Sequence, residues 1–437
     1  MPVTLREIRA ARRRIADGIC LTPCPESIPL GELDPRRPRV FCKLENFQRT
    51  GSFKERGARN ALLLLPADQR KRGVIAASAG NHALGLAYHG RLLNIPVTVV
   101  MPDYAPLIKI TTCERLGARV ILRGVDFSAA RAEADRIALG EGLAYIHGFD
   151  ADSIIAGQGT LGLEILEQVP KVDVVVCPVG GGGLIAGVAT AIKTVWPRVK
   201  VIGVESEATG NFSAAWRARR PIAVRRRPTL ADGLATLTVG ANAFAQARPH
   251  VDAVIRVSER WIALAILRML ELEKTVVEGA AAVPLAALMS GQLGQWIMGG
   301  AHGPHALRVA TSLSAWGPCA PPAHRHNPTN VVLIVGGGNI DPTILSRVIE
   351  NGLVHDGRLS RFSVRISDRP GGLAELCRRI ADAGASIKDV EHDRAFSGPD
   401  VSAARAICTV ETRDRGHIRA LHAALRKAGF TPRSIPA

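Results

Sequence analysis

The stretch Thr50-Gly51-Ser52-Phe53-Lys54-Glu55-Arg56-Gly57-Ala58 places one lysine beside an aromatic residue and between two glycines, early in a chain of 437 residues. Most lysines are solvated surface charges, so a lysine alone carries little information. This one indicates chemistry only if other segments supply a phosphate site, a polar contact for a ring and a site for a carboxylate.

Glycines cluster again at Pro178-Val179-Gly180-Gly181-Gly182-Gly183, between a buried strand predicted at 172–177 and a helix predicted at 184–195. Unhindered backbone N–H groups at the positive end of a helix bind anions. A plain tight turn between a strand and a helix rarely needs four glycines. The stretch matches neither a Walker loop nor a dinucleotide fingerprint. We therefore interpret Gly180, Gly181, Gly182 and Gly183 as a phosphate site.

A third stretch, Ser78-Ala79-Gly80-Asn81-His82, also follows a predicted strand and opens a helix. It could bind a second anion, such as a substrate carboxylate, while the Asn81 amide contacts a polar ring substituent. Taken alone, His82 is better explained as a histidine with a structural hydrogen bond at the start of a helix.

The composition is that of an α/β protein, with 47% hydrophobic, 22% charged and 4% aromatic residues. The longest apolar run, 174–192, contains Pro178 and the four glycines, so it does not predict a membrane span. Residues 1–20 lack the apolar core of a signal peptide. We expect a cytoplasmic protein with no membrane partner.

The formal net charge of +17 could indicate nucleic-acid binding. The basic residues are scattered, however, with only short clusters at 12–14 and 225–227, and no aromatic or zinc-binding pattern accompanies them. We expect no nucleic-acid partner. The eight cysteines show no paired metal spacing and predict reduced thiols.

Apolar runs at 74–77, 97–101 and 120–122 alternate with predicted helices, which indicates a parallel sheet in a small lobe at about 71–148. Residues 291–330 have no clear period and predict a surface insertion. From 360 to 437 the predicted order is βαββα, with a possible last strand after Phe430, which is the ferredoxin-like βαββαβ arrangement.

Together these stretches resemble the fold-type II pyridoxal-phosphate enzymes, and most closely the threonine/serine dehydratase (threonine ammonia-lyase) family. The turn Arg369-Pro370-Gly371-Gly372-Leu373 resembles that of an ACT domain. The resemblance implies a two-lobed α/β catalytic domain, similar to tryptophan synthase β, over 1–345, and an ACT regulatory domain over 360–437. The catalytic-domain matches occur in the family's order: 50–58, 78–82, Gly157-Gln158-Gly159-Thr160, 178–183, Asp232-Gly233, Glu278-Gly279 and Gly337-Gly338-Asn339.

On this resemblance Lys54 would hold pyridoxal 5'-phosphate covalently and act as the catalytic base. Phe53 would pack against the ring, Asn81 would contact the ring hydroxyl, Gly180–Gly183 would bind the phosphate, and Gly336 would lie at the pyridine nitrogen. The amino-acid carboxylate would be received by Ser78, Ala79, Gly80, Asn81 and His82.

The implied reaction converts L-threonine, and also L-serine, to 2-oxobutanoate or pyruvate and ammonia. This reaction belongs to amino-acid metabolism and, for threonine, to isoleucine biosynthesis. An amino-acid effector would bind at the ACT domain of a homodimer or homotetramer and regulate the enzyme allosterically.

Three features of the site refine this resemblance or leave alternatives open. Ala79 stands where serine racemases carry a second serine, so elimination is favoured over racemisation, with a serine racemase-like enzyme as the alternative. Gly336 replaces the usual Ser or Cys and, together with the insertion at 291–330, allows a catalytically weakened relative that senses amino acids. Glu205 fits the cation site of some relatives, but Thr209 and Asn211 do not complete it, so we expect no metal.

Overall fold

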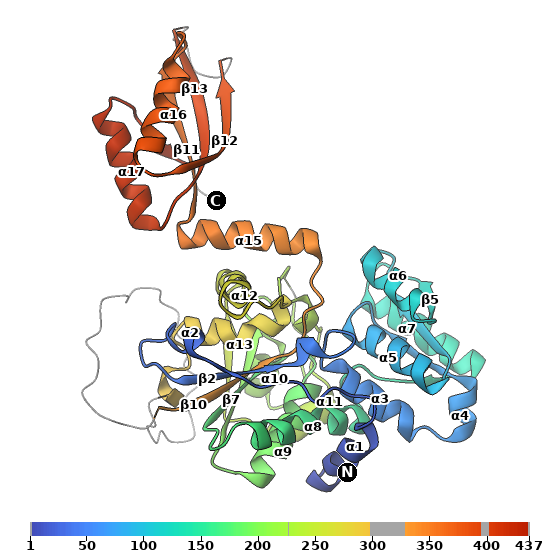
Figure 1. Cartoon of the computed structure of the whole chain (residues 1–437). Helices are drawn as coiled ribbons and strands as arrows, with labels where there is room; N and C mark the ends of the chain where they lie inside the picture. Colours follow the sequence, from blue (N-terminus) through green and yellow to red (C-terminus); the bar gives the residue numbers. More distant parts are fainter. Residues whose placement is uncertain (1, 226, 298–327, 395–401, 436–437) are drawn as a thin grey trace. The chain divides into compact units, whose positions relative to one another are not determined.

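The structure, a computed structural model, describes residues 2–225, 227–297, 328–394 and 402–435 (Figure 1). The chain forms two compact units, Met1–Asp341 and Pro342–Ala437. Among the described residues, no helix is both long enough and apolar enough to cross a membrane.

The larger sheet of the N-terminal unit has six strands in the order β1-β2-β10-β7-β8-β9. Every pair is parallel except β1 with β2. The strand predicted at 172–177 is confirmed within two residues as β7. The strands are β1 (Glu26–Ser27), β2 (Arg39–Leu44), β7 (Val174–Pro178), β8 (Lys200–Ser206), β9 (Ala253–Val257) and β10 (Asn330–Val335).

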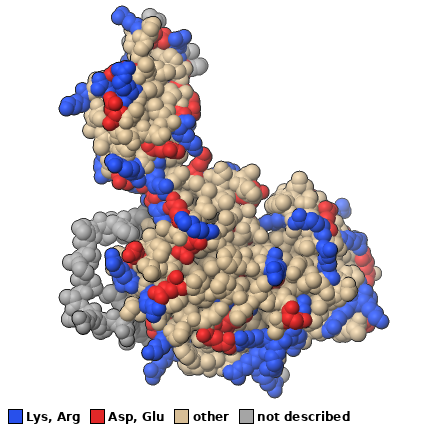
Figure 2. Space-filling model, viewed as in Figure 1, with Lys and Arg blue, Asp and Glu red and all other residues tan. Residues whose placement is uncertain are grey.

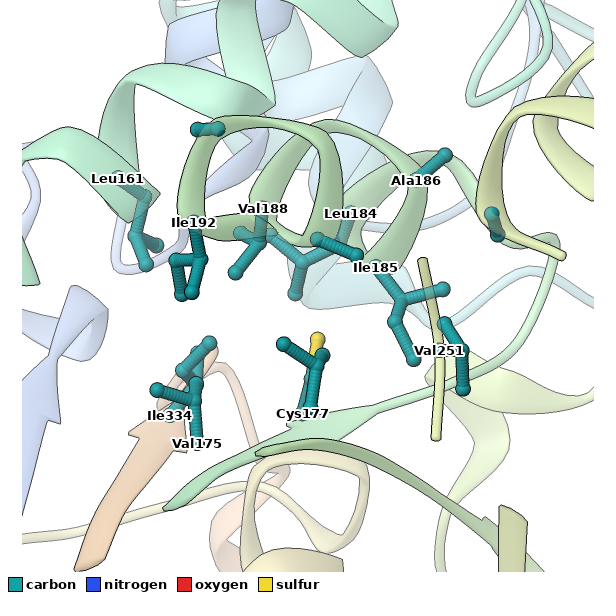
Figure 3. Packing of buried hydrophobic residues seen from close by; sticks show 14 of the residues in the cluster. Leu161, Val175, Cys177, Leu184, Ile185, Ala186, Val188, Ile192, Val251 and Ile334 are labelled. Carbon is teal, nitrogen blue, oxygen red and sulfur yellow. The ribbon is translucent and has the colours of Figure 1, made fainter. Parts of the chain in front are cut away.

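Helix α9 (Gly183–Val195) packs its apolar side chains onto this sheet. Figure 3 shows Leu184, Val188 and Ile192 of α9 facing Val175 and Cys177 of β7. On its other side α9 lies against α8 (Asp152–Gln168). A Cβ on Gly187 would come within 2.2 Å of the Ile155 carbonyl oxygen, so this close approach requires a glycine.

Other helices complete the layers of the N-terminal unit. Helix α1 begins with a capping box, in which Thr4 and Glu7 satisfy each other's backbone N–H groups. On the face drawn in Figure 2, basic side chains gather over α1, which carries three arginines in its last turn. These helices are α1 (Leu5–Ile15), α2 (Ile28–Gly31), α10 (Asn211–Ala218), α11 (Ala241–Ala247), α12 (Glu259–Glu273) and α13 (Gly279–Met289), with 3-10 turns at Glu45–Phe47 and Asp232–Leu234.

The smaller sheet of the N-terminal unit is parallel, in the order β5-β4-β3-β6. Its strands fall where apolar runs predicted them, apart from β6, which has only two residues. The strands are β3 (Val74–Ala77), β4 (Val97–Met101), β5 (Arg119–Leu122) and β6 (Ala144–Tyr145), and the helices are α4 (Ala67–Arg72), α5 (Asn81–Leu93), α6 (Leu107–Arg115) and α7 (Phe127–Glu141).

Helix α3 (Lys54–Leu64) joins the two layers, because it packs against α5 of the smaller sheet and against α8 of the larger one. A buried ion cluster holds its first turn. The guanidinium of Arg56 lies 2.7 Å from Glu45 Oε2 and 2.6 Å from Glu164 Oε1, and Lys43 Nζ lies 2.6 Å from Glu164 Oε2. The lysine stretch is therefore rigidly positioned between the two sheets.

The predicted insertion at 291–330 falls largely outside the described residues. Its start contains the short helix α14 (Gly294–Ile297), and its end leads into β10 at Asn330. Residues 298–327 are not described, so the prediction of a surface insertion there stays a prediction.

The C-terminal unit is an antiparallel sheet in the order β12-β13-β11-β14 with helices packed on it. Its apolar core includes Phe362, Leu376, Ile380, Leu421 and Leu425. The expected βαββαβ order is observed, preceded by a helix, α15, that was not expected. The elements are α15 (Pro342–Asp356), β11 (Leu359–Ser367), α16 (Gly372–Asp382), β12 (Ser386–Asp393), β13 (Ala403–Glu411), α17 (Arg415–Lys427) and β14 (Arg433–Ser434).

Candidate active site

A cavity of about 720 Å³ lies in the N-terminal unit, where the carboxyl ends of β3, β7 and β10 meet. Ligands of α/β proteins bind at such strand ends. Three separate stretches singled out in the sequence line this one cavity. Its lining includes Phe53, Lys54, Ser78, Ala79, Gly80, Asn81, His82, Gly180, Gly181, Gly182, Gly183, Glu278 and Gly336.

The loop before Lys54 is hydrogen-bonded to the segment that follows β10. The Phe53 N–H donates to the Gly336 carbonyl at 3.0 Å, and the Gly338 N–H donates to the Gly51 carbonyl at 2.9 Å. An isolated antiparallel bridge between Ser52 and Gly337 lies between these two bonds. The position of the lysine therefore depends on a segment far along the chain.

Lys54 is the first residue of α3, and its amine opens onto the cavity. Nζ donates to the Gly148 carbonyl at 2.6 Å and lies 5.3 Å from the centroid of the Phe53 ring. Burial lowers the pKa of Lys54 to about 8, while the charge of Glu278 acts in the opposite direction. A lysine with a lowered pKa is a better nucleophile and base near neutral pH, because more of it is unprotonated.

The four glycines form the turn between β7 and α9. Gly182 has φ +93°, a conformation that favours glycine. A Cβ on Gly181 would lie 2.4 Å from Cγ of Phe149, and one on Gly183 would lie 2.3 Å from the Phe149 carbonyl oxygen. The loop therefore presents bare backbone to the cavity. The first N–H groups of α9 have no acceptor within the helix, as an anion site requires.

The loop from Ser78 to His82 lies at the end of β3, as expected. The Ser78 hydroxyl accepts a hydrogen bond from the Gly80 N–H at 3.3 Å. The His82 ring is buried, and its Nε2 lies 3.1 Å from the Ile146 carbonyl oxygen. Burial lowers the pKa of His82 to about 3, with a further contribution from Lys54. His82 is therefore neutral and brings no positive charge for a carboxylate.

The Asn81 side chain lies between two other polar side chains. Its Nδ2 donates to Glu278 at 2.8 Å (Oε1) and 3.1 Å (Oε2), and its Oδ1 accepts from Asn339 Nδ2 at 2.9 Å. Glu278 precedes α13 and is 6% exposed. Burial raises the pKa of Glu278 to about 7, although the Asn81 hydrogen bond lowers it.

Glu278 and Asn339 belong to matched motifs but were not chosen as site residues from the sequence. Glu278 could have been identified from the sequence, because it is an acidic residue in an otherwise apolar stretch. Gly148 and Phe149 were also missed, because their contributions come from a backbone carbonyl and from packing, which leave no pattern in the sequence.

Glu205, weighed as a cation ligand, has another partner. Its two carboxylate oxygens accept the backbone N–H groups of Phe212 and Ser213 at 2.9 and 3.0 Å, at the start of α10. Burial raises the pKa of Glu205. Over the described ranges, no group of three or more His, Cys, Asp or Glu side chains could hold a metal ion.

The sequence model of the family described as "Pyridoxal-phosphate dependent enzyme" matches residues 15–299. The chain belongs to this family. Its cofactor is pyridoxal phosphate, as predicted. Within the family, the L-threonine ammonia-lyase of Thermotoga maritima is 40% identical over 433 residues, which cover 99% of this chain and 100% of that protein.

Two solved structures of family members match the fold. The processed form of threonine deaminase isoform 2 from Solanum lycopersicum superposes with a TM-score of 0.69 at 31% identity, covering 80% of this chain and 95% of that one. Maize serine racemase superposes with a TM-score of 0.69 at 31% identity, covering 81% and 99%. The fold-type II catalytic architecture with parallel sheets is thereby confirmed.

The residues around the cavity fit the cofactor of this family. Gly180–Gly183 line the cavity with backbone and carry no side chains, and Lys54 supplies an amine with a lowered pKa. Asn81 lines the same cavity with a side-chain amide.

Proposed function

We propose that this enzyme converts L-threonine, and also L-serine, to the corresponding 2-oxo acid and ammonia. The observation that carries the proposal is the cavity in which the Lys54 amine, the four-glycine turn and the loop from Ser78 to His82 lie together. The names of the relatives support this choice of reaction, since both an L-threonine ammonia-lyase and a threonine deaminase match most of the chain.

We propose the following role for each predicted residue of the cofactor site. Lys54 would hold pyridoxal phosphate, Phe53 would pack beside its ring, and Asn81 would donate to a ring oxygen. Gly180, Gly181, Gly182 and Gly183 would bind the phosphate, and Gly336 would adjoin the ring at the end of β10. When bound, the cofactor supplies an electron sink for charge that develops at the substrate Cα.

The protein side of the reaction then follows from the contacts. The Lys54 amine, once free, takes the proton from the substrate Cα, a role that its lowered pKa permits near neutral pH. Ser78, Ala79, Gly80 and Asn81 would bind the substrate carboxylate through the Ser78 hydroxyl and backbone N–H groups. His82 would support this loop through its bond to Ile146 rather than through charge.

We further propose that residues 1–345 form the catalytic domain and residues 360–437 an ACT domain that binds an amino-acid effector. The βαββαβ order and the turn at Arg369–Leu373 support this, and so does the Thermotoga relative, whose match spans almost the whole chain. Such domains usually bind effectors where two copies pair, so the enzyme would be a homodimer or homotetramer. With threonine as substrate, the reaction would belong to isoleucine biosynthesis.

The purified protein tests the proposal directly. It should bind pyridoxal phosphate and form 2-oxobutanoate from threonine and pyruvate from serine, whereas Lys54→Ala should abolish covalent cofactor binding and both activities. Addition of isoleucine or valine should change the rate through the C-terminal unit. A wild-type protein that takes up no pyridoxal phosphate would refute the proposal.

Gly336 favours a second candidate, a catalytically weakened relative that senses amino acids. No side chain is present here at the end of β10, and a Cβ would lie 3.3 Å from Cδ1 of Phe53. This candidate predicts effector binding with turnover near background, and a gain in turnover in Gly336→Ser. Vigorous 2-oxobutanoate production by the wild type would exclude it.

A further inference from the structure

Two side-chain amides and one carboxylate form a hydrogen-bonded chain at the wall of the cavity. Asn339 Nδ2 donates both to the Thr50 carbonyl at 2.7 Å and to Asn81 Oδ1 at 2.9 Å. Asn81 Nδ2 in turn donates to Glu278 Oε1 at 2.8 Å. The chain links the lysine stretch to the start of α13.

The two ends of an asparagine carboxamide are nearly equal in size, so only hydrogen bonds decide which end points where. Asn339 offers a donor to one end of the Asn81 carboxamide, and Glu278 offers an acceptor to the other. Reversing the amide would bring donor against donor and acceptor against acceptor. Its orientation is therefore fixed by these two neighbours.

The Glu278 carboxyl group lies close to the backbone of Gly337, just after β10. A Cβ on Gly337 would lie 2.7 Å from Glu278 Oε1, and the Glu278 N–H donates to the Gly337 carbonyl at 3.1 Å. The carboxyl group thus occupies the position beside the cavity that a side chain at 337 would otherwise take.

Resting on the proposed function, we propose that Glu278 is a positioning residue that acts through Asn81. Together with Asn339 it holds the Asn81 amide nitrogen in one orientation, and the second N–H of that nitrogen remains for the ring oxygen of the cofactor. The charge on Glu278 then controls how strongly Asn81 donates to the ring.

Three charged groups face the Glu278 carboxyl from neighbouring elements. Burial has the largest effect on the pKa of Glu278 and raises it, and the Asn81 hydrogen bond lowers it. The charge of Asp232 also raises this pKa, while the charges of Lys109 and Lys54 lower it. Lys109 and Asp232 lie 3.9 Å apart at the cavity and belong to α6 and to the 3-10 turn. Because burial raises the pKa of Glu278 to about 7, its charge changes in the neutral range.

The test uses the full-length protein and reads the absorbance of bound pyridoxal phosphate across pH, together with its dissociation constant. The wild type should show a spectral step that Glu278→Gln lacks, while Glu278→Gln keeps an acceptor for Asn81 and binds the cofactor within about threefold of wild type. Glu278→Leu removes the acceptor and should weaken cofactor binding by about tenfold or more.

Two matched variants change the charge near Glu278 without touching Asn81. Asp232→Asn should move the spectral step to lower pH, and Lys109→Met should move it to higher pH, since these groups act on the Glu278 pKa in opposite directions. In an Asn81→Ala background, Glu278→Leu should have no further effect on cofactor affinity, because its action passes through Asn81.

The outcomes separate this inference from the proposed function. If the wild type binds pyridoxal phosphate but Glu278→Gln keeps the same step, or Glu278→Leu binds as tightly as wild type, only the role of Glu278 is overturned. If the wild type binds no pyridoxal phosphate, both are overturned. Loss of the step in Glu278→Gln, with opposite shifts in the two matched variants, would support the inference.

Discussion

Nε of Arg56 lies 2.7 Å from Oε2 of Glu45, in the first turn of the helix that begins with the cavity lysine. Arg56 is fully buried and also binds Glu164. Removal of one partner from a buried ion cluster leaves an uncompensated charge in a medium of low polarity. This loss typically costs about 3–5 kcal/mol.

We therefore expect Arg56→Met to lower the free energy of unfolding by about that amount, as measured by urea denaturation followed by circular dichroism. Arg12→Met is the matched control. It breaks an ion pair with Glu167 whose side chains are 37% and 57% exposed, so the change should stay below about 1 kcal/mol. Equal losses in the two variants would contradict the structural role of the buried cluster.

The lowered pKa of Lys54 predicts how covalent loading of the cofactor depends on pH. Only the unprotonated amine reacts, so the loading rate of cofactor-free protein should rise with pH and level off above a midpoint near 8. Stopped-flow absorbance after mixing with pyridoxal phosphate measures this rate. A midpoint near that of an ordinary lysine, about 10.4, would refute the prediction.

A glycine-to-alanine substitution should have opposite effects in the four-glycine turn and in helix α7. Gly181→Ala places a Cβ 2.4 Å from the Phe149 ring, so we expect a loss of about 1–3 kcal/mol in stability and weaker cofactor binding. Gly140 lies in α7 with open space around it, so Gly140→Ala should stabilise by about 0.5–1 kcal/mol. Thermal unfolding of both variants, with and without pyridoxal phosphate, provides the comparison.

Ala79 and Lys54 line the same cavity, but only the lysine can carry a proton. Ala79→Ser adds a hydroxyl that can serve as a second acid or base. We expect D-serine formation from L-serine to rise roughly tenfold or more, as measured by chiral chromatography. The double variant Lys54→Ala/Ala79→Ser should form none, and unchanged D-serine in Ala79→Ser would show that the hydroxyl does not reach the substrate.

Local patterns in the sequence were sufficient for much of the fold. Apolar runs predicted β3, β4 and β7, since parallel strands are buried on both faces. Helix α3 begins at Lys54, and its first turn contains a buried arginine and a glycine that are required by contacts with distant parts of the chain. A Cβ on Gly57 would lie 2.5 Å from Nε2 of Gln158.

The parts of the site that escaped prediction are those whose partners lie far away in the sequence. In the sequence alone, Arg56 looks like an ordinary surface arginine. Only the structure shows that Glu45 and Glu164 lie beside it. The role of Glu278 likewise becomes clear only from its contact with Asn81, the first residue of α5 beside the smaller sheet. Motif residues were found because their chemistry is local, whereas pairings between distant carboxylates and amides have no local signature.

The location of β10 also bears on how the enzyme is made. This strand lies between β2 and β7 in the sheet, and the segment just after it is hydrogen-bonded to the lysine loop in both directions. A ribosome therefore releases Lys54 and the four glycines long before it releases the strand that closes the sheet. Since domains fold as units during synthesis, a nascent chain that ends before residue 330 should not capture the cofactor. Cofactor loading would thus mark the completion of the N-terminal unit.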